Sequence, residues 1–159
     1  MKTKLINAMD NSIVSEVELI YKTNIKPSER IKVEDSKKVY SVFKTVYDYN
    51  TIEHKESFYA MYLNRANKIL AVILISEGGT SACLVDVKII LQAALRVNAS
   101  AIILSHNHPS GQLIASSADI SITNKVKEAA KLLDMQVIEH IILTPEDNSY
   151  YSFADNGQI

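Results

Sequence analysis

Residues 101–111 read Ala-Ile-Ile-Leu-Ser-His-Asn-His-Pro-Ser-Gly, and the interpretation of the whole chain starts from this stretch. The apolar run over residues 101–104 predicts a buried strand. Pro109 and Gly111 then break the strand and permit a tight turn. Two of the four histidines of the chain, His106 and His108, therefore stand where a buried strand ends.

The two histidines have a spacing that suits a metal ion. Residues two apart on an extended segment point the same way, so His106 and His108 can direct two imidazole nitrogens at one point. Imidazole is a good zinc ligand, and a third protein ligand such as Asp119 would leave the fourth tetrahedral position for water. An open position of this kind is typical of catalytic rather than structural zinc.

Asp119 lies at the start of a predicted helix. Ser116 or Ser117 can serve as the N-cap, which places Asp119 in the first helical turn. An aspartate is favourable there without any metal, because anionic side chains stabilise helix N-termini. The neighbouring histidine pair favours the metal-ligand interpretation.

The four positions together resemble a known motif. His106, His108, Ser116 and Asp119 match His-x-His, seven residues, Ser, two residues, Asp, which is similar to the JAMM (MPN+) zinc hydrolase motif. The string over residues 106–111 resembles the bacterial RadC-like branch of that family. The resemblance implies a Zn²⁺ ion on His106, His108 and Asp119 and an α/β fold in which helices sandwich a mixed β-sheet, the JAB/MPN-like, cytidine-deaminase-like architecture.

The resemblance also implies two catalytic residues. A family glutamate at the head of a strand acts as general base, and here that position is Glu56, with Glu53 as the alternative because strand boundaries are uncertain by a few residues. Ser116 matches the family serine whose hydroxyl hydrogen-bonds the oxyanion. A helix-capping serine is the simpler explanation, and both roles are compatible.

Periodicity predicts helices interleaved with strands, which favours a mixed sheet covered on both faces. Residues 1–34 are expected to form an N-terminal strand and linker, and residues 35–159 the RadC-like JAMM/MPN catalytic domain.

Within the predicted helix over 117–133, the side expected to be buried includes Ile120, Val126 and Leu133. The predicted strands are 13–21, 56–63, 69–75, 101–104, 137–143 and 150–153, and the helices are 36–49, 85–97 and 117–133.

Composition narrows the functional classes. The 159 residues suit one domain, and the apolar runs are too short for a membrane span or a signal peptide, so a cytoplasmic location without membrane contact is expected. The single Cys83 excludes an internal disulfide and the Pro-Cys-x-x-Cys segment of zinc deaminases. Cys83 itself is expected to be a small buried hydrophobe.

Charge argues against nucleic acid as the main partner. The net charge of −1 offers no global attraction to phosphates. Lys125, Lys127 and Lys131 share one predicted helix, where a solvated face is the simpler explanation. Many RadC-like chains carry an upstream helix-hairpin-helix DNA-binding segment, and this sequence is expected to start too late to include one.

The sequence thus predicts a zinc-dependent hydrolase of peptide or isopeptide bonds that acts on an unidentified protein or peptide. The alternative is a RadC-like accessory protein in DNA repair or another DNA transaction, without peptidase activity. The RadC-like branch has an Asp-His pair where Glu139-His140 stands, and His140 is expected to be either a residue behind the metal or a structural group.

Overall fold

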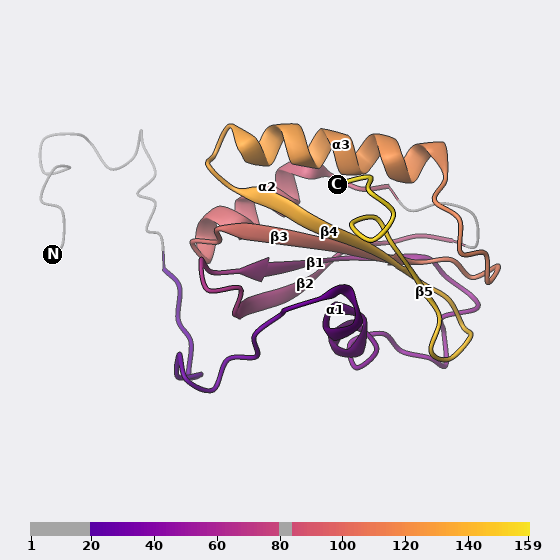
Figure 1. The fold of residues 1–159 in the computed structure, drawn as a ribbon, viewed down its shortest axis with the longest axis horizontal. Helices are drawn as coiled ribbons and strands as arrows, with labels where there is room; N and C mark the ends of the chain where they lie inside the picture. Colours follow the sequence, from indigo (N-terminus) through magenta and orange to yellow (C-terminus); the bar gives the residue numbers. More distant parts are fainter. Residues whose placement is uncertain (1–19, 80–83) are drawn as a thin grey trace, which may run out of the picture.

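A computed structural model of the chain describes residues 20–79 and 84–159. One five-stranded sheet has the strand order β2-β1-β3-β4-β5. Helices α2 and α3 cover one face of the sheet and α1 covers the other, as predicted (Figure 1). The elements are α1 Ser36–Phe43, β1 Ser57–Leu63, β2 Ile69–Glu77, α2 Val87–Arg96, β3 Ala101–Asn107, α3 Ser117–Lys131, β4 Gln136–Leu143 and β5 Tyr150–Ser152.

Strand β3 occupies the middle of the sheet. It pairs antiparallel with β1 and parallel with β4, which it reaches through α3. The outer pairs β1–β2 and β4–β5 are antiparallel. All seven residues of β3 are buried, which agrees with its apolar sequence and its cover of helices on both faces. The sheet is therefore mixed, and its most protected strand leads directly to the histidine pair.

The core lies in two layers that follow the alternation of β3. Ile102 and Leu104 pack in the layer that also contains Val126 of α3. Ile103 points the opposite way and packs in the layer that contains Phe43 of α1. A side chain of this size stabilises the fold by about 1.5–3 kcal/mol when fully buried, so both layers contribute to stability. The side chain of His106 has the same parity as Leu104, so it lies on the α3 face.

Helix α1 is shorter than the predicted helix over residues 36–49. It begins after Asp35, whose side chain accepts a hydrogen bond from the backbone N–H of Lys38, and it ends at Phe43. Residues 44–54 form turns instead. The carboxylate of Asp48 accepts hydrogen bonds from both nitrogens of Asn50, a local pattern that competes with helix continuation. Tyr47 is nevertheless buried.

The buried face of α3 differs from the predicted one. Ile120 and Leu133 are 38% and 41% exposed, so their predicted burial is wrong, whereas Thr123 is only 1% exposed. Thr123, Val126 and Ala130 face the sheet at helical spacing, and Leu133 lies beyond the end of the helix. A polar residue takes a core position here because its hydroxyl has hydrogen-bond partners, which are described below.

Other predicted boundaries shift by a few residues. Strand β3 extends three residues beyond the predicted 101–104. Of the predicted strand over 13–21, residues 13–19 lie outside the described residues, and Ile20 and Tyr21 are in no strand. Cys83 also lies outside the described residues. Within the described ranges, no helix is long and apolar enough to cross a membrane.

Candidate metal centre

The histidine pair stands at the end of the central strand. His106 is the sixth residue of β3, and the backbone N–H of His108 still donates to the carbonyl of Leu143, 2.8 Å away, which keeps His108 beside β4. Asn107 points to the opposite face, where its side chain accepts from the N–H of Ser57 and donates to the carbonyl of Ile52. This anchoring fixes the strand end, so both imidazoles extend from the same side of the sheet.

Asp119 is brought to the histidines by a helix cap. Gly111 lies in the turn that returns the chain toward α3. Its φ of 76° is readily adopted by glycine but unfavourable for residues with a Cβ atom. The hydroxyl of Ser116 then accepts from the N–H of Asp119 at 3.1 Å, and the carboxylate of Asp119 accepts from the N–H of Ser116 at 2.7 Å. This reciprocal capping box holds the carboxylate in one orientation.

The three side chains converge on one point. Nε2 of His106 lies 2.9 Å from Nε2 of His108 and 3.1 Å from Oδ1 of Asp119, and Oδ2 of Asp119 lies 3.5 Å from Nε2 of His108. In a tetrahedral zinc site with bonds of about 2.0–2.2 Å, neighbouring ligand atoms are about 3.3–3.6 Å apart. The observed separations fall within a few tenths of an ångström of that range.

The protonation of His108 also suits a metal ligand. Its Nδ1 lies 2.8 Å from the backbone carbonyl of Gln112, which can only accept a hydrogen bond, so Nδ1 carries the proton. The Nε2 of a neutral His108 is then a lone pair directed at His106 and Asp119. Among the described residues, His106, His108 and Asp119 form the group of His, Cys, Asp and Glu side chains that could hold a metal ion.

Electrostatics make this point attractive to a cation. Burial by itself would raise the pKa of Asp119, but its close contacts with His106 and His108 outweigh burial and hold that pKa well below its usual range. The hydrogen bond that a protonated His108 donates to Asp119 raises the pKa of His108. The carboxylate therefore stays ionised, so a negative charge lies at the point where the three ligand atoms converge.

A pocket of about 550 Å³ opens beside the ligands. Its polar lining includes His108, Asp119 and Ser116, and its apolar wall includes Phe58, Leu84, Ile114 and Ile122. Leu84 and Ile114 are strongly exposed, so this wall is available to a bound molecule. Among the described residues that line the pocket, none is Lys or Arg.

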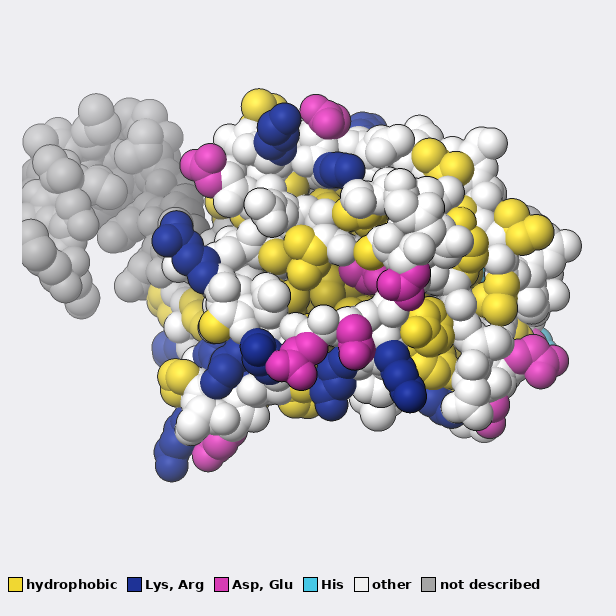
Figure 2. Space-filling model, in the orientation of Figure 1, with side chains coloured by type: hydrophobic (Ala, Val, Ile, Leu, Met, Phe, Trp, Pro, Cys, Tyr) yellow, Lys and Arg dark blue, Asp and Glu magenta, His cyan; other side chains and the backbone are white. Residues whose placement is uncertain are grey.

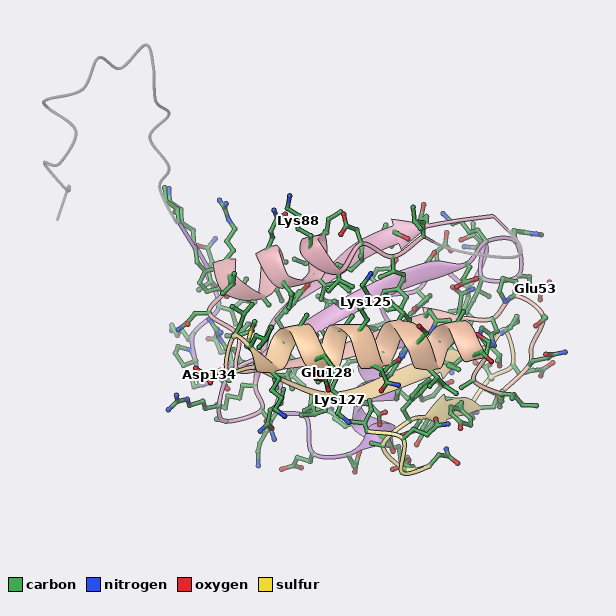
Figure 3. All side chains as sticks on the ribbon, turned by 90° about the horizontal axis from the view of Figure 1, so that it is seen from above. Glu53, Lys88, Lys125, Lys127, Glu128 and Asp134 are labelled. Atoms are coloured by element: carbon green, nitrogen blue, oxygen red, sulfur yellow. The ribbon has the colours of Figure 1, made fainter. Side chains whose placement is uncertain are left out.

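The structure distinguishes the two glutamates that the sequence left open. Glu56 immediately precedes β1 and continues the ladder with β2, because its backbone bonds to Gly78 and Gly79. Its side chain lines the pocket with Asp119, and burial raises its pKa, partly opposed by His106. Glu53 is exposed in the turn before β1 and lies at the periphery in Figure 3. Glu56, and not Glu53, shares the pocket with the ligands.

A further histidine lies behind the ligands. His140 is fully buried, and its Nε2 is 2.8 Å from Nδ1 of His106. Its other nitrogen lies 2.6 Å from the hydroxyl of Thr123. Sequence reasoning considered a position behind the metal for His140 but missed Thr123. The available signal was its position four residues after Asp119, which places both on one side of α3.

Comparisons with known proteins match most of the chain to one family. The model of the RadC-like JAB domain family matches residues 33–158. A UPF0758 protein of Flavobacterium johnsoniae is 35% identical over 92% of this chain and 62% of its own length. UPF0758 proteins of Porphyromonas gingivalis and Geotalea uraniireducens are 38% and 41% identical, over 80% and 66% of this chain. The chain spans 55% and 45% of those two relatives. This chain is a member of the RadC-like JAB domain family.

Proposed function

We propose that this chain is a zinc-dependent hydrolase of amide bonds in a peptide or isopeptide substrate. The observation that carries the proposal is the convergence of three ligand atoms, all within 4.8 Å of one another, at the wall of a pocket. The same pocket contains a carboxylate, Glu56, that is not part of the ligand group. A metal site next to a free carboxylate is well suited to the hydrolysis of an unactivated bond, because the metal can activate a water molecule and the carboxylate can accept its proton.

Zinc is the metal that best suits this donor set. Two imidazoles and one carboxylate are typical of catalytic zinc, with the fourth position left open. When bound, zinc would polarise the substrate carbonyl and lower the pKa of a water molecule to about 7.

Glu56 is proposed to be the general base. It would accept a proton from the attacking water and then transfer this proton to the leaving amine, so that the carboxylate is regenerated in each cycle. The raised pKa of Glu56, caused mainly by burial, brings the group closer to neutral pH and suits a residue that must both take and give a proton.

Ser116 is proposed to stabilise the oxyanion that forms from the substrate carbonyl. Its hydroxyl has two lone pairs and one proton. The helix cap uses a lone pair, because Ser116 accepts from the N–H of Asp119. The proton therefore remains free to be donated to the substrate oxygen, so that capping and catalysis are compatible roles of one side chain.

The lining of the pocket favours an uncharged stretch of peptide as substrate. Phe58, Leu84 and Ile114 offer apolar contact, and the charged groups around the ligands are carboxylates that would repel phosphate. In Figure 3, Lys125 and Lys127 project from opposite sides of α3, and Figure 2 has acidic and basic side chains mixed on the visible face. No specific observation therefore favours the DNA accessory role, which remains a prediction, as does the cytoplasmic location.

The test combines metal content with activity. The purified chain should contain about one zinc per chain by mass spectrometry, and His106→Ala should lose it. Glu56→Gln should keep zinc but lose hydrolysis of a fluorogenic peptide library by about 100- to 10,000-fold. The matched control Glu53→Gln should keep both. A wild-type chain that takes up no zinc would refute the proposal.

A further inference from the structure

Three side chains from three different elements form a buried chain of hydrogen bonds behind the ligands. Nδ1 of His106 on β3 contacts Nε2 of His140 on β4 at 2.8 Å. Nδ1 of His140 contacts the hydroxyl of Thr123 on α3 at 2.6 Å. That hydroxyl donates to the backbone carbonyl of Asp119, also at 2.6 Å. This series of hydrogen bonds thus starts at one ligand residue, His106, and ends at another, Asp119.

The position of each proton in this series of hydrogen bonds follows from its last acceptor, the backbone carbonyl of Asp119. A carbonyl oxygen only accepts, so the single hydroxyl proton of Thr123 points at Asp119. The hydroxyl oxygen must then accept from His140, which places the His140 proton on Nδ1. Nε2 of a neutral His140 is left as an acceptor, so Nδ1 of His106 must be the donor. Nε2 of His106 is thereby left as a lone pair, which is the form that binds a metal.

The surroundings of His140 fix the orientation of its fully buried ring. Its ring stacks on Phe153 with centroids 4.6 Å apart and meets the edge of Phe58 at 5.6 Å. The ring is thus held with Nδ1 directed at Thr123 and Nε2 directed at His106.

A β-bulge directs His140 toward α3. Ile102 pairs with Val137, but the next residue of β3, Ile103, pairs with Glu139, so Ile138 is an extra residue in β4. Residues three apart on a regular strand face opposite sides. The extra residue allows both Val137 and His140 to face the α3 layer.

We infer that Thr123 and His140 are positioning residues that hold His106 as the Nδ1–H tautomer and so keep its Nε2 free for the metal. This inference rests on the metal site of the proposed function. Neither residue contacts the metal point; they act through His106 and the backbone of Asp119. Substitution of such a supporting residue typically weakens metal binding by about 10- to 100-fold.

The test uses the full chain and two readouts. Thr123→Val removes the hydroxyl and keeps the shape, and it should weaken zinc binding about 10- to 100-fold in a competition with a chelator. Nitrogen-15 NMR of the metal-free chain at alkaline pH should find the His106 proton on Nδ1 in the wild type and partly on Nε2 in Thr123→Val. Thr123→Ser should restore both readouts. Val126→Ala, at a buried core position of the same helix, should lower the melting temperature without changing either one.

A second variant covers the case in which Thr123→Val does not fold. His140→Gln offers an amide oxygen to His106 and an amide N–H to Thr123, and it should keep zinc affinity within about tenfold of wild type. His140→Leu should not. Wild-type zinc affinity in Thr123→Val or His140→Leu, or a His106 proton on Nε2 in the wild type, would overturn the inference. A wild type that binds no zinc but has the Nδ1 proton would refute the proposed function and support the inferred tautomer.

Discussion

The two proposed roles of Ser116 can be separated by one substitution. In Ser116→Ala, the N–H of Asp119 loses the capping oxygen 3.1 Å away, and the pocket loses the hydroxyl proton. These losses should appear in different measurements, since the cap acts on unfolding and the donor acts on the barrier to hydrolysis.

The expected magnitudes are far apart. Loss of an N-cap serine costs about 1 kcal/mol of stability. With an unfolding entropy of about 2.1 cal/mol/K per residue, a chain of 159 residues should then melt about 3 °C lower. Loss of an oxyanion donor costs about 100- to 1,000-fold in kcat. A shift of 3 °C leaves nearly all molecules folded at 25 °C, so it cannot account for such a drop in rate.

The assay measures kcat on a fluorogenic peptide with zinc-loaded protein, and the melting temperature by calorimetry. Ser116→Gly is the informative companion, because glycine costs only a few tenths of a kcal/mol at an N-cap yet also lacks the hydroxyl. It should match Ser116→Ala in kcat and lie closer to wild type in melting temperature. Ser117→Ala, at the exposed first helical residue, should retain wild-type kcat. If Ser116→Ala keeps kcat within about threefold of wild type, the serine is a cap and nothing more.

Three further results are expected. Chelation of zinc initially present at 1,000 times its Kd should remove about 4 kcal/mol of stability, which is a fall of about 12 °C in melting temperature; an unchanged melting curve would argue against a bound metal. In the metal-free chain, the lowered pKa of Asp119 stabilises the fold above pH 3.8 and the raised pKa of His108 stabilises it below pH 6.5. Stability to urea should therefore fall as the pH drops below that window and as it rises through the raised pKa of His108, and both slopes should flatten in Asp119→Asn. Phe43→Ala should cost about 3–5 kcal/mol in urea unfolding, against less than about 0.5 kcal/mol for the exposed Leu132→Ala.

Most of the fold was predictable where the hydrophobic periodicity of a segment agrees with the turn-forming or capping residues at its ends. The strands predicted over 56–63 and 69–75 correspond to β1 and β2, and the helices predicted over 36–49 and 85–97 begin within two residues of α1 and α2. The end of α1 was not predictable from its apolar residues. Tyr47 is buried although it lies beyond the last residue of α1, so burial of an aromatic side chain does not mark how far the helix extends.

The candidate site was predictable to the extent that it depends on local spacing. The capping box that orients Asp119 involves residues three apart, and the histidine pair lies on one strand. The contacts of His140 depend instead on the register of β3 against β4. This register includes a β-bulge that the local sequence of β4 does not predict. The role of Thr123 was not predicted for a related reason. A threonine within an apolar helix pattern looks like a surface residue until its partner on another strand is known.

The central β3–α3–β4 crossover has a consequence for how this site can diversify. The candidate ligands and their inferred supporting residues all lie between His106 and His140, in one contiguous stretch of 35 positions. Glu56 and the exposed Leu84 reach the pocket from elsewhere in the chain. Part of the pocket wall, including Leu84, thus lies outside the stretch that holds the candidate ligands, so a substitution at Leu84 can alter which molecules fit the pocket without changing a ligand residue.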